Sequence, residues 1–329
     1  VVGSVVASDG LKDGAPSEFE GARARFARLI DDKLYPGGQL AIRVRGREVV
    51  RWASGMARGL RDTERVEPVA MRDDTLVPVF SAGKPLVACA IMLLEEQGKL
   101  DVEEPLAKHI PGFDAFGKGE LTVLDVLTHR SGVLAPELIT APERWIDLAK
   151  LRASLAGMQP KYGRGMLAYA PFEYGWLLGA VVESVSSLPF PEFVRQNIAL
   201  PAKLNDLWFS VPPELRDGIA RVYWLGPPRL MVAGCNAAEN FEETNNSAAF
   251  FDADVPGAGL VTNAATLAAS YDLKSPEANG FRARSASLPG RISNRARPNA
   301  RGGVMDLPGA AGLPRVDQRR THRVLSLIH

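Results

Sequence analysis

The sequence predicts an α+β fold in which an antiparallel sheet packs against helices, and two observations indicate it. Residues 39–44 and 48–53 alternate between hydrophobic and polar side chains on either side of a Gly-containing turn, which is the pattern of a β-hairpin. Residues 18–30, just before this hairpin, place hydrophobic side chains on one helical face. A helix followed directly by a hairpin favours an antiparallel sheet covered by helices over a doubly wound parallel sheet.

Cap and breaker residues predict where the first helix begins and ends. Ser17 and Glu20 have the spacing of a capping box, in which Ser17 is the N-cap and Glu20 occupies the third helical position. The Pro-Gly-Gly run at residues 36–38 then separates this helix from the hairpin.

The next informative stretch, residues 77–85, runs into an apolar segment at 86–94 and predicts a short extended segment that leads into a buried helix. Ser81 lies at the junction, where Ser is favoured as a helix cap. Lys84 follows three residues later, so in a helix it stands about one turn above Ser81 on the same face. A hydroxyl and an amine at this spacing can act as nucleophile and base, because desolvation beside an apolar helix lowers the pKa of a lysine.

The Ser-x-x-Lys spacing is weak evidence when it stands alone. Ordinary Ser and Lys frequencies produce about one such match by chance in a chain of this length. The alternative interpretation is a helix cap followed by a solvated lysine.

His129 lies near the end of a short helix predicted at 121–132. It is either catalytic or a loop histidine that hydrogen-bonds to nearby backbone. We favour the second interpretation, because no acidic residue lies at triad-like spacing.

Tyr169 precedes a second buried helix predicted at 176–183. Its phenol is placed either to face a cleft or to lie as an amphipathic aromatic at the edge of the core. Further along, Thr262 or Asn263 is expected to cap a helix that continues to Tyr271.

Composition and charge exclude several functional classes. The chain has 329 residues and is 46% hydrophobic, which is enough for a large core in one domain or in two packed subdomains. Before Phe281 there are 29 basic and 36 acidic residues, and this net charge of −7 offers no footprint for nucleic acid. No apolar run approaches the roughly 18 residues of a membrane span.

The sequence also bears on location and cofactors. Residues 1–7 lack the charged n-region and the apolar core of an export signal, so we expect a cytoplasmic location. If a leader precedes the given sequence, the alternative is a periplasmic or secreted protein. There is no Cys/His cluster, phosphate-cradling glycine loop or dinucleotide fingerprint. We therefore expect neither a metal nor an organic cofactor.

The character of the chain changes after about residue 272. Residues 281–329 contain ten Arg, no Lys and two acidic residues, a net charge of +8. No window alternates like a strand and no helical face builds up, so the segment buries too little apolar surface to offset its ordering entropy. Residues 273–329 are therefore interpreted as a disordered basic tail, which could bind acidic partners, or as out-of-frame translation of a high-GC gene. We favour the second interpretation.

Several separated motifs occur in an order typical of one group of enzymes. Ser81-Ala82-Gly83-Lys84 has the form of a Ser-x-x-Lys nucleophile motif. The flanking motifs are Gln97–Asp101, Leu127–Gly132, Tyr169 with Tyr174–Gly179, and Gly257–Thr262. Over roughly residues 18–272 the chain thus resembles the penicillin-recognising serine hydrolases, which include class C β-lactamases, D-alanyl-D-alanine carboxypeptidases and, with the greatest similarity here, family VIII carboxylesterases.

This resemblance implies an architecture and a set of site residues. Residues 1–272 are expected to form a β-lactamase/transpeptidase-like domain, with a mostly helical subdomain at roughly 85–200 inserted between segments of the sheet. Ser81, Lys84 and Tyr169 fall at the positions of the catalytic serine, lysine and tyrosine of the family.

Two departures from the family pattern refine the expected function. Pro171 stands where the β-lactamase branch usually has the Asn of a Tyr-x-Asn motif, and the missing amide favours an esterase. The third family motif, Lys-Thr-Gly or His- or Trp-Gly-Gly, is not recognisable, and Gly302-Gly303 is its nearest remnant. The strand of that motif normally lends one backbone N–H to the oxyanion hole, and losing one such donor costs about 3–4 kcal/mol of transition-state stabilisation.

We therefore expect a serine hydrolase that cleaves small carboxylic esters through an acyl-enzyme. A β-lactamase or D-amino-acid peptidase is the alternative within the same class. A homologue without activity, which binds a ligand or a partner protein through the same cleft, is the alternative from a different class.

Overall fold

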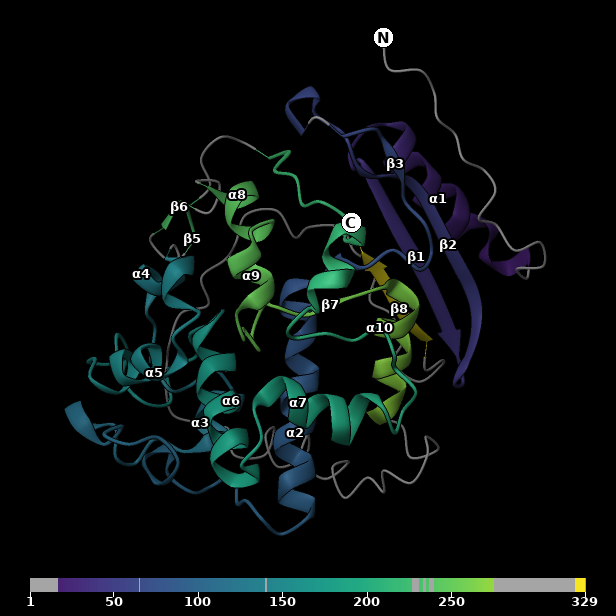
Figure 1. Cartoon of the computed structure of the whole chain (residues 1–329). Coiled ribbons are helices and arrows are strands. Elements are labelled where there is room, and N and C mark those ends of the chain that lie inside the picture. The colour runs from purple at the N-terminus through teal and green to yellow at the C-terminus, as the bar shows by residue number, and fades with distance from the viewer. Residues whose placement is uncertain are drawn as a thin grey trace.

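The computed structural model describes residues 17–64, 66–139, 141–226, 231–232, 235–236, 240–274 and 323–328. Figure 1 shows a twisted sheet with helices on its two faces, set beside a larger group of helices. The α+β class expected from the sequence is confirmed.

The main sheet is antiparallel and has the strand order β3-β2-β1-β8. Arg45 (φ 51°) and Gly46 (φ 74°) form the turn between β1 and β2, and both adopt the left-handed conformation that a two-residue type I′ hairpin turn requires. The predicted hairpin is therefore confirmed. The strands are β1 (Gly37–Val44), β2 (Arg47–Arg58), β3 (Val69–Ala70) and β8 (Arg323–Ile328).

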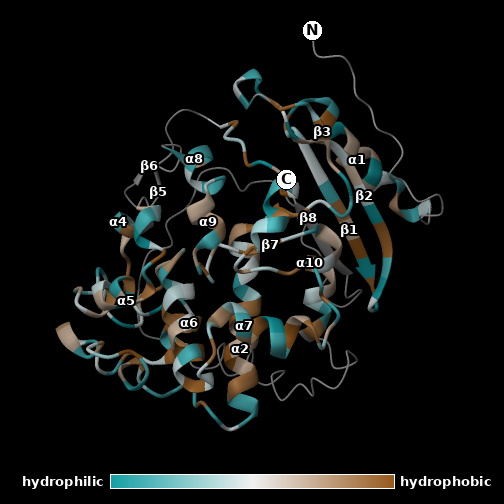
Figure 2. Cartoon of the chain, in the orientation of Figure 1, coloured by the Kyte–Doolittle hydropathy of each residue, from teal (hydrophilic) through white to brown (hydrophobic). Residues whose placement is uncertain are grey.

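The two faces of β1 pack against different helices, because successive side chains of a strand point in opposite directions. Leu40 and Ile42 pack in a small core with Phe26 of α1 (Glu20–Asp31), whose mixed colours in Figure 2 are those of an amphipathic helix. Ala41 belongs instead to the main core, beneath α10 (Ala264–Tyr271). The side-chain oxygen of the buried Gln39 accepts a hydrogen bond from the backbone N–H of Ala264 (2.9 Å), which ties the start of α10 to the sheet.

Strand β8 corrects one expectation about residues 273–329, where no strand was predicted. Residues 323–328 pair with β1, from Gln39 opposite Ile328 to Val44 opposite Arg323. The open edge of β1 supplies the hydrogen-bonding partners that the strand needs, and a local alternation pattern contains no information about such a distant partner. Residues 275–322, which include Gly302-Gly303, lie outside the described part of the chain.

The first helix also begins differently from the prediction. Ser17 lies in a 3-10 turn (Ser17–Phe19), and the N-cap of α1 is Phe19, without a side-chain capping hydrogen bond. The predicted capping box is therefore wrong. At α10 the prediction is confirmed, because the side chain of Asn263 caps the helix by accepting a hydrogen bond from the N–H of Thr266 (2.8 Å).

Helices α2 and α6 pack against each other in the middle of the larger group of helices, which forms the layer beside the sheet (Figure 1). Both are rich in buried hydrophobic residues (Figure 2), which explains the continuous apolar runs of their sequences. The α-helices of this layer are α2 (Lys84–Glu96), α3 (Val123–Leu127), α4 (Pro136–Ile139), α5 (Leu148–Ala156), α6 (Glu173–Ser186), α7 (Phe190–Val194), α8 (Phe241–Asn245) and α9 (Ala248–Asp252).

Two short strand pairs lie outside the main sheet. Strand β4 (Val77–Pro78) pairs with β7 (Val261–Thr262), and β5 (Met231–Val232) pairs with β6 (Cys235–Asn236). In the described residues no single helix is long and apolar enough to cross a bilayer; only the segments 173–186 and 190–199, bent by 72° relative to each other, pass the length and composition test as a pair.

A close backbone approach joins α6 to the turn before β7. A Cβ atom placed on Gly175 would lie 1.9 Å from the backbone nitrogen of Gly257, a distance that no side chain can occupy. Glycine at position 175 is therefore what allows α6 to press directly against the backbone at Gly257.

We expect the Gly175→Ala variant to lower the free energy of unfolding by at least about 1–3 kcal/mol, because the added methyl forces helix and turn apart. Gly21→Ala is the matched control: no atom lies within 4 Å of the added methyl, and removing a helical glycine should raise the free energy of unfolding by up to about 1 kcal/mol. Urea unfolding followed by circular dichroism measures both values. A Gly175→Ala protein as stable as the parent would contradict this account of the contact.

Candidate active site

The segment after β4 places Ser81 at the surface. The pairing of β4 with β7 and the hydrogen bond from Val79 N–H to Leu260 O (2.9 Å) fix the backbone just before it. Phe80 then adopts a left-handed conformation (φ 48°), which costs a non-glycine residue on the order of 1–3 kcal/mol. The chain continues through a 3-10 turn (Phe80–Gly83) into α2.

The position of Ser81 differs from the helix cap expected from the sequence. The N-cap of α2 is Gly83, and no side chain forms a capping hydrogen bond there. Ser81 lies inside the preceding 3-10 turn with an exposed side chain. Its hydroxyl is therefore not engaged in capping and hydrogen-bonds to other side chains instead.

Lys84 is the central group of the site, and its side chain is only 8% exposed at the start of α2. Its Nζ atom donates hydrogen bonds to Gly257 O (2.6 Å), Pro171 O (2.7 Å) and Ser81 Oγ (3.0 Å). Two of these three acceptors are backbone carbonyls, which can only accept hydrogen bonds. The third is a hydroxyl, which can also donate.

This arrangement positions the lysine to act as a base toward Ser81. A neutral amine has two N–H bonds and one lone pair. When the two carbonyls take the two N–H bonds, the lone pair of Lys84 is left to accept the proton of the Ser81 hydroxyl. The same three positions also accommodate the ammonium form, which donates to all three oxygens.

The surroundings of Lys84 lower its affinity for a proton. Burial lowers the pKa of Lys84 below its usual value, since a charged amine loses solvation there. Tyr169 and the carboxylate of Glu173 act in the opposite direction and raise the pKa, but burial is the largest effect.

Glu173 is a residue of the site that the sequence analysis missed. It is 1% exposed at the start of α6, and burial raises its pKa. Its carboxylate accepts hydrogen bonds from Ala135 N–H (2.5 Å) and Phe172 N–H (3.3 Å), so it also ties a loop to this helix. An acidic residue at the head of an apolar helical run was the available signal in the sequence.

Tyr169 brings a third side chain to Ser81 from the loop before α6. Its hydroxyl lies 2.8 Å from Ser81 Oγ, and the Nζ of Lys84 lies 5.1 Å from the centre of its ring. The side chain is 53% exposed. The structure therefore brings Ser81, Lys84 and Tyr169 together, although 88 residues separate the serine from the tyrosine.

His129 holds the backbone on both sides of Tyr169. Its carbonyl accepts a hydrogen bond from Ala168 N–H (2.9 Å), and its Nδ1 accepts one from Ala170 N–H (3.2 Å). Its ring packs against those of Tyr169 and Tyr174, with centroid distances of 4.8 and 4.9 Å. The backbone-bonding interpretation of this histidine is thus confirmed, and the residue it positions is Tyr169.

The charge state of His129 follows from its environment. Burial and, second, the nearby charge of Lys84 lower the pKa of His129 from 6.5 to about 4. The imidazole is therefore neutral at pH 7, as an Nδ1 that accepts a hydrogen bond requires.

Two further features bear on the chemistry of the site. The N–H of Ser81 lies in the first turn of a helix, where backbone N–H groups lack intrahelical partners and can serve an oxyanion. In the part of the chain that the structure describes, no group of three or more His, Cys, Asp or Glu residues is arranged to hold a metal ion.

Comparison with known proteins gives the following relationships. The family model described as "Beta-lactamase" matches residues 22–317, which extends beyond residue 272. The chain is 28% identical over 266 residues to "Esterase/beta-lactamase LipL" of Mycobacterium tuberculosis, covering 75% of this chain and 60% of LipL. The chain therefore spans less than two thirds of that relative.

Solved structures share the fold. A penicillin-binding protein homologue from Caulobacter crescentus superposes with a TM-score of 0.70 at 26% identity, covering 82% of this chain and 72% of the other. A family VIII carboxylesterase gives a TM-score of 0.68 at 24% identity, covering 81% and 72%. These similarities confirm the β-lactamase/transpeptidase-like fold expected from the sequence.

The lowered pKa of His129 predicts that the folded protein loses stability in acid. The folded state keeps this imidazole neutral down to about pH 4, whereas the unfolded chain protonates it near pH 6.5. Between these values the unfolded state binds more protons, so the free energy of unfolding falls as the pH is lowered from 6.5 to 4. In His129→Gln, which keeps a neutral acceptor, this fall should be smaller. Urea unfolding of the parent and of His129→Gln at a series of pH values tests this prediction. Identical slopes of the free energy of unfolding against pH in the two proteins would refute the lowered pKa of His129.

Proposed function

The chain belongs to the Beta-lactamase family, and from this premise we propose that it is a serine hydrolase that cleaves small carboxylic esters through an acyl-enzyme. One observation carries the proposal: Ser81 Oγ lies within hydrogen-bond distance of both Lys84 Nζ (3.0 Å) and Tyr169 OH (2.8 Å). A hydroxyl with two proton-accepting neighbours is the arrangement that an activated nucleophile needs.

In the first half of the proposed reaction, Ser81 Oγ attacks the ester carbonyl carbon. The serine proton passes to the neutral amine of Lys84, with Tyr169 sharing it, while negative charge develops on the carbonyl oxygen. The backbone N–H of Ser81 and the positive end of the helix that begins there stabilise this charge.

Collapse of the tetrahedral intermediate breaks the bond between the carbonyl carbon and the alcohol oxygen. The leaving alcohol takes the proton back through Tyr169, a half-exposed residue whose hydroxyl lies within hydrogen-bond distance of Ser81 Oγ. Water then attacks the carbonyl carbon of the acyl-enzyme and gives a proton to the same groups. The bond between this carbon and Ser81 Oγ breaks, the carboxylic acid leaves, and a proton returns to Ser81. These steps use only side chains and backbone groups of this chain.

An ester is preferred as the substrate for two reasons. Pro171 has no side-chain amide to hold the acylamino group of a β-lactam, and its carbonyl is already occupied by Lys84. The name of the LipL relative includes esterase as well as β-lactamase, so β-lactam hydrolysis is the second candidate. Steady-state turnover of nitrocefin compared with p-nitrophenyl butyrate discriminates the two, and faster nitrocefin turnover would favour the second.

Ser81→Ala is expected to lower kcat/KM for p-nitrophenyl acetate and butyrate at least about a thousandfold, because it removes the hydroxyl that forms the acyl-enzyme. Labelling by a fluorophosphonate probe should disappear in the same variant. Hydrolysis that persists unchanged in Ser81→Ala would refute the mechanism. A parent protein that neither labels nor hydrolyses would instead support a binding protein without activity.

Tyr169→Phe is expected to lower kcat for p-nitrophenyl butyrate about a hundredfold, because proton transfer to the leaving alcohol is impaired while the ring and its packing against His129 remain. Tyr162→Phe is the matched control, since Tyr162 is also a partly exposed tyrosine of the same loop. Its kcat should equal that of the parent. Equal kcat values for Tyr169→Phe and the parent would show that the Tyr169 hydroxyl takes no part in the reaction.

A further inference from the structure

Phe80, the residue before Ser81, holds an unfavourable backbone conformation. Its φ of 48° lies in the left-handed region, where the β-carbon of a bulky residue crowds the backbone. Such a conformation persists only where the surrounding structure enforces it. A return of Phe80 to a negative φ would rotate the chain that follows. Ser81 Oγ would then leave its position 3.0 Å from Lys84 Nζ and 2.8 Å from Tyr169 OH.

The hydrogen bond that closes the turn around Phe80 does not select this conformation. Ala82 N–H donates to Val79 O (3.1 Å), so Phe80 is the second residue of a four-residue turn. The commonest turns closed by this bond have a negative φ at their second residue. The left-handed form is therefore selected by what the side chain of Phe80 contacts.

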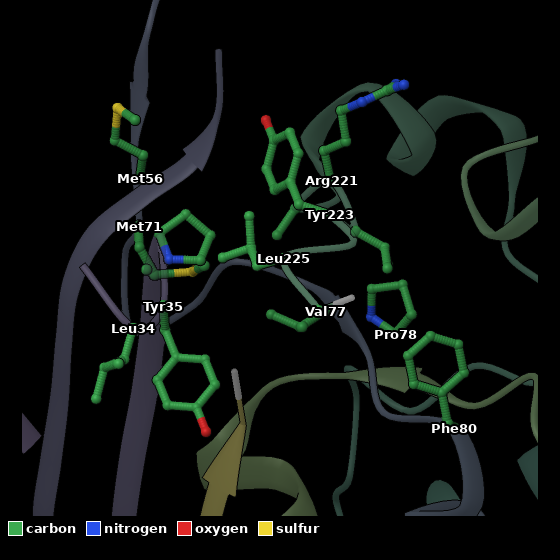
Figure 3. A pocket seen from close by; sticks show the side chains of 15 residues that line it. Leu34, Tyr35, Met56, Met71, Val77, Pro78, Phe80, Arg221, Tyr223 and Leu225 are labelled. Atoms are coloured by element: carbon green, nitrogen blue, oxygen red, sulfur yellow. The ribbon is translucent and has the colours of Figure 1, made fainter. Parts of the chain in front are cut away.

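Two aromatic rings hold the ring of Phe80. Phe241, the first residue of α8, lies 6.0 Å from it between ring centroids, and Phe250 of α9 lies 6.2 Å away, with tilted planes in both pairs. Tilted ring pairs at such distances are favourable beyond the apolar area that they bury. Figure 3 shows a third ring, that of Pro78, beside Phe80.

Space next to Phe80 would allow its ring to move if these contacts were lost. Phe80 and Pro78 lie at one end of a cavity of about 370 Å³, and Met56 and Met71 lie on the opposite side (Figure 3). This volume exceeds that of a phenyl ring. The ring pairs, rather than close packing on every side, therefore restrain Phe80.

The two phenylalanines that hold Phe80 are anchored differently. Phe250 is 1% exposed and packs edge-on against Trp145 (6.3 Å) and Phe251 (5.6 Å), so it forms a rigid wall. Phe241 is half-buried and also pairs with Trp224 (5.1 Å). Phe241 is therefore the one of the two that can be changed with the smaller effect on folding.

We infer that Phe241 is a positioning residue: through the ring of Phe80 it holds the backbone conformation that presents the hydroxyl of Ser81. In the part of the chain that the structure describes, no ring pair or hydrogen bond joins the side chain of Phe241 to Lys84 or Tyr169, so its effect passes through Phe80. The inference rests on the proposed function, because it assigns a role in presenting the nucleophile.

The first test is Phe241→Leu, which keeps an apolar side chain but removes the ring. We expect kcat for p-nitrophenyl butyrate to fall about tenfold, with KM changed less than twofold because no substrate contact is removed. Phe241→Tyr, which keeps the ring at a half-buried position, should retain the parent kcat within twofold. Phe116→Leu is the matched control: Phe116 is also left-handed (φ 56°) but is 62% exposed and forms no ring pair with Phe80. Its kcat should equal that of the parent.

Phe80→Gly separates the conformational role from a general loss of packing. Glycine adopts a positive φ without strain, so Ser81 no longer depends on the ring pairs. Phe241→Leu added to Phe80→Gly should therefore change kcat less than twofold. A tenfold fall in both backgrounds, or no fall in the parent background, would refute the inference. Phe80→Asn, with a residue that tolerates the left-handed region, replaces Phe80→Gly if the latter does not fold.

Hydrogen–deuterium exchange reads the same backbone without a substrate. In Phe241→Leu, peptides that contain residues 79–84 should exchange at least about tenfold faster, while peptides from α3 should be unchanged. If exchange rises in this way but the parent neither labels with fluorophosphonate nor hydrolyses esters, the proposed function fails and Phe241 still holds Phe80. If hydrolysis depends on Ser81 but neither exchange nor kcat responds to Phe241→Leu, the positioning role is refuted and the proposed function stands.

Discussion

The set of three hydrogen bonds around Lys84 Nζ is the constraint on which the rest of the structure depends. Two of its acceptors, the carbonyls of Pro171 and Gly257, belong to segments far apart in the chain, and the third is the hydroxyl of Ser81. A buried amine without these partners would cost several kcal/mol of desolvation. Helix α2, the start of α6 and the turn before β7 must therefore keep fixed relative positions, and the close approach of Gly175 to Gly257 provides this.

Charge is distributed around this amine so that it holds a proton less tightly than a solvated lysine does. Burial lowers the pKa of Lys84, the carboxylate of Glu173 partly opposes burial, and His129 stays neutral beside it. A cationic imidazole at this position would repel the ammonium form, whereas the neutral ring supports the backbone of Tyr169. The packing of His129 against Tyr169, the hydrogen bonds of Lys84 and the protonation states of Lys84 and His129 therefore depend on one another.

Local patterns were sufficient to predict part of the fold, but they only suggested the site, which the order of the family's motifs then indicated. The spacing of Ser81 and Lys84 follows from helical geometry, and the β1–β2 hairpin from alternation around a Gly-containing turn. The role of Tyr169 could be expected only from the order of motifs in a resembling family, because no local rule links it to a serine 88 residues away. Backbone groups such as Gly257 O carry no sequence signal at all, and the capping role assigned to Ser17 was wrong because a 3-10 turn took its place.

The pairing of β1 with β8 has a consequence for how the protein is made. During synthesis Val44 emerges from the ribosome long before Arg323, its partner in the sheet. At about 5–20 residues per second the nascent chain carries one bare edge of β1 for on the order of 15–60 s. An uncovered strand edge is a template for pairing with other chains, so this interval is the one in which molecular chaperones would matter most for the yield of native protein.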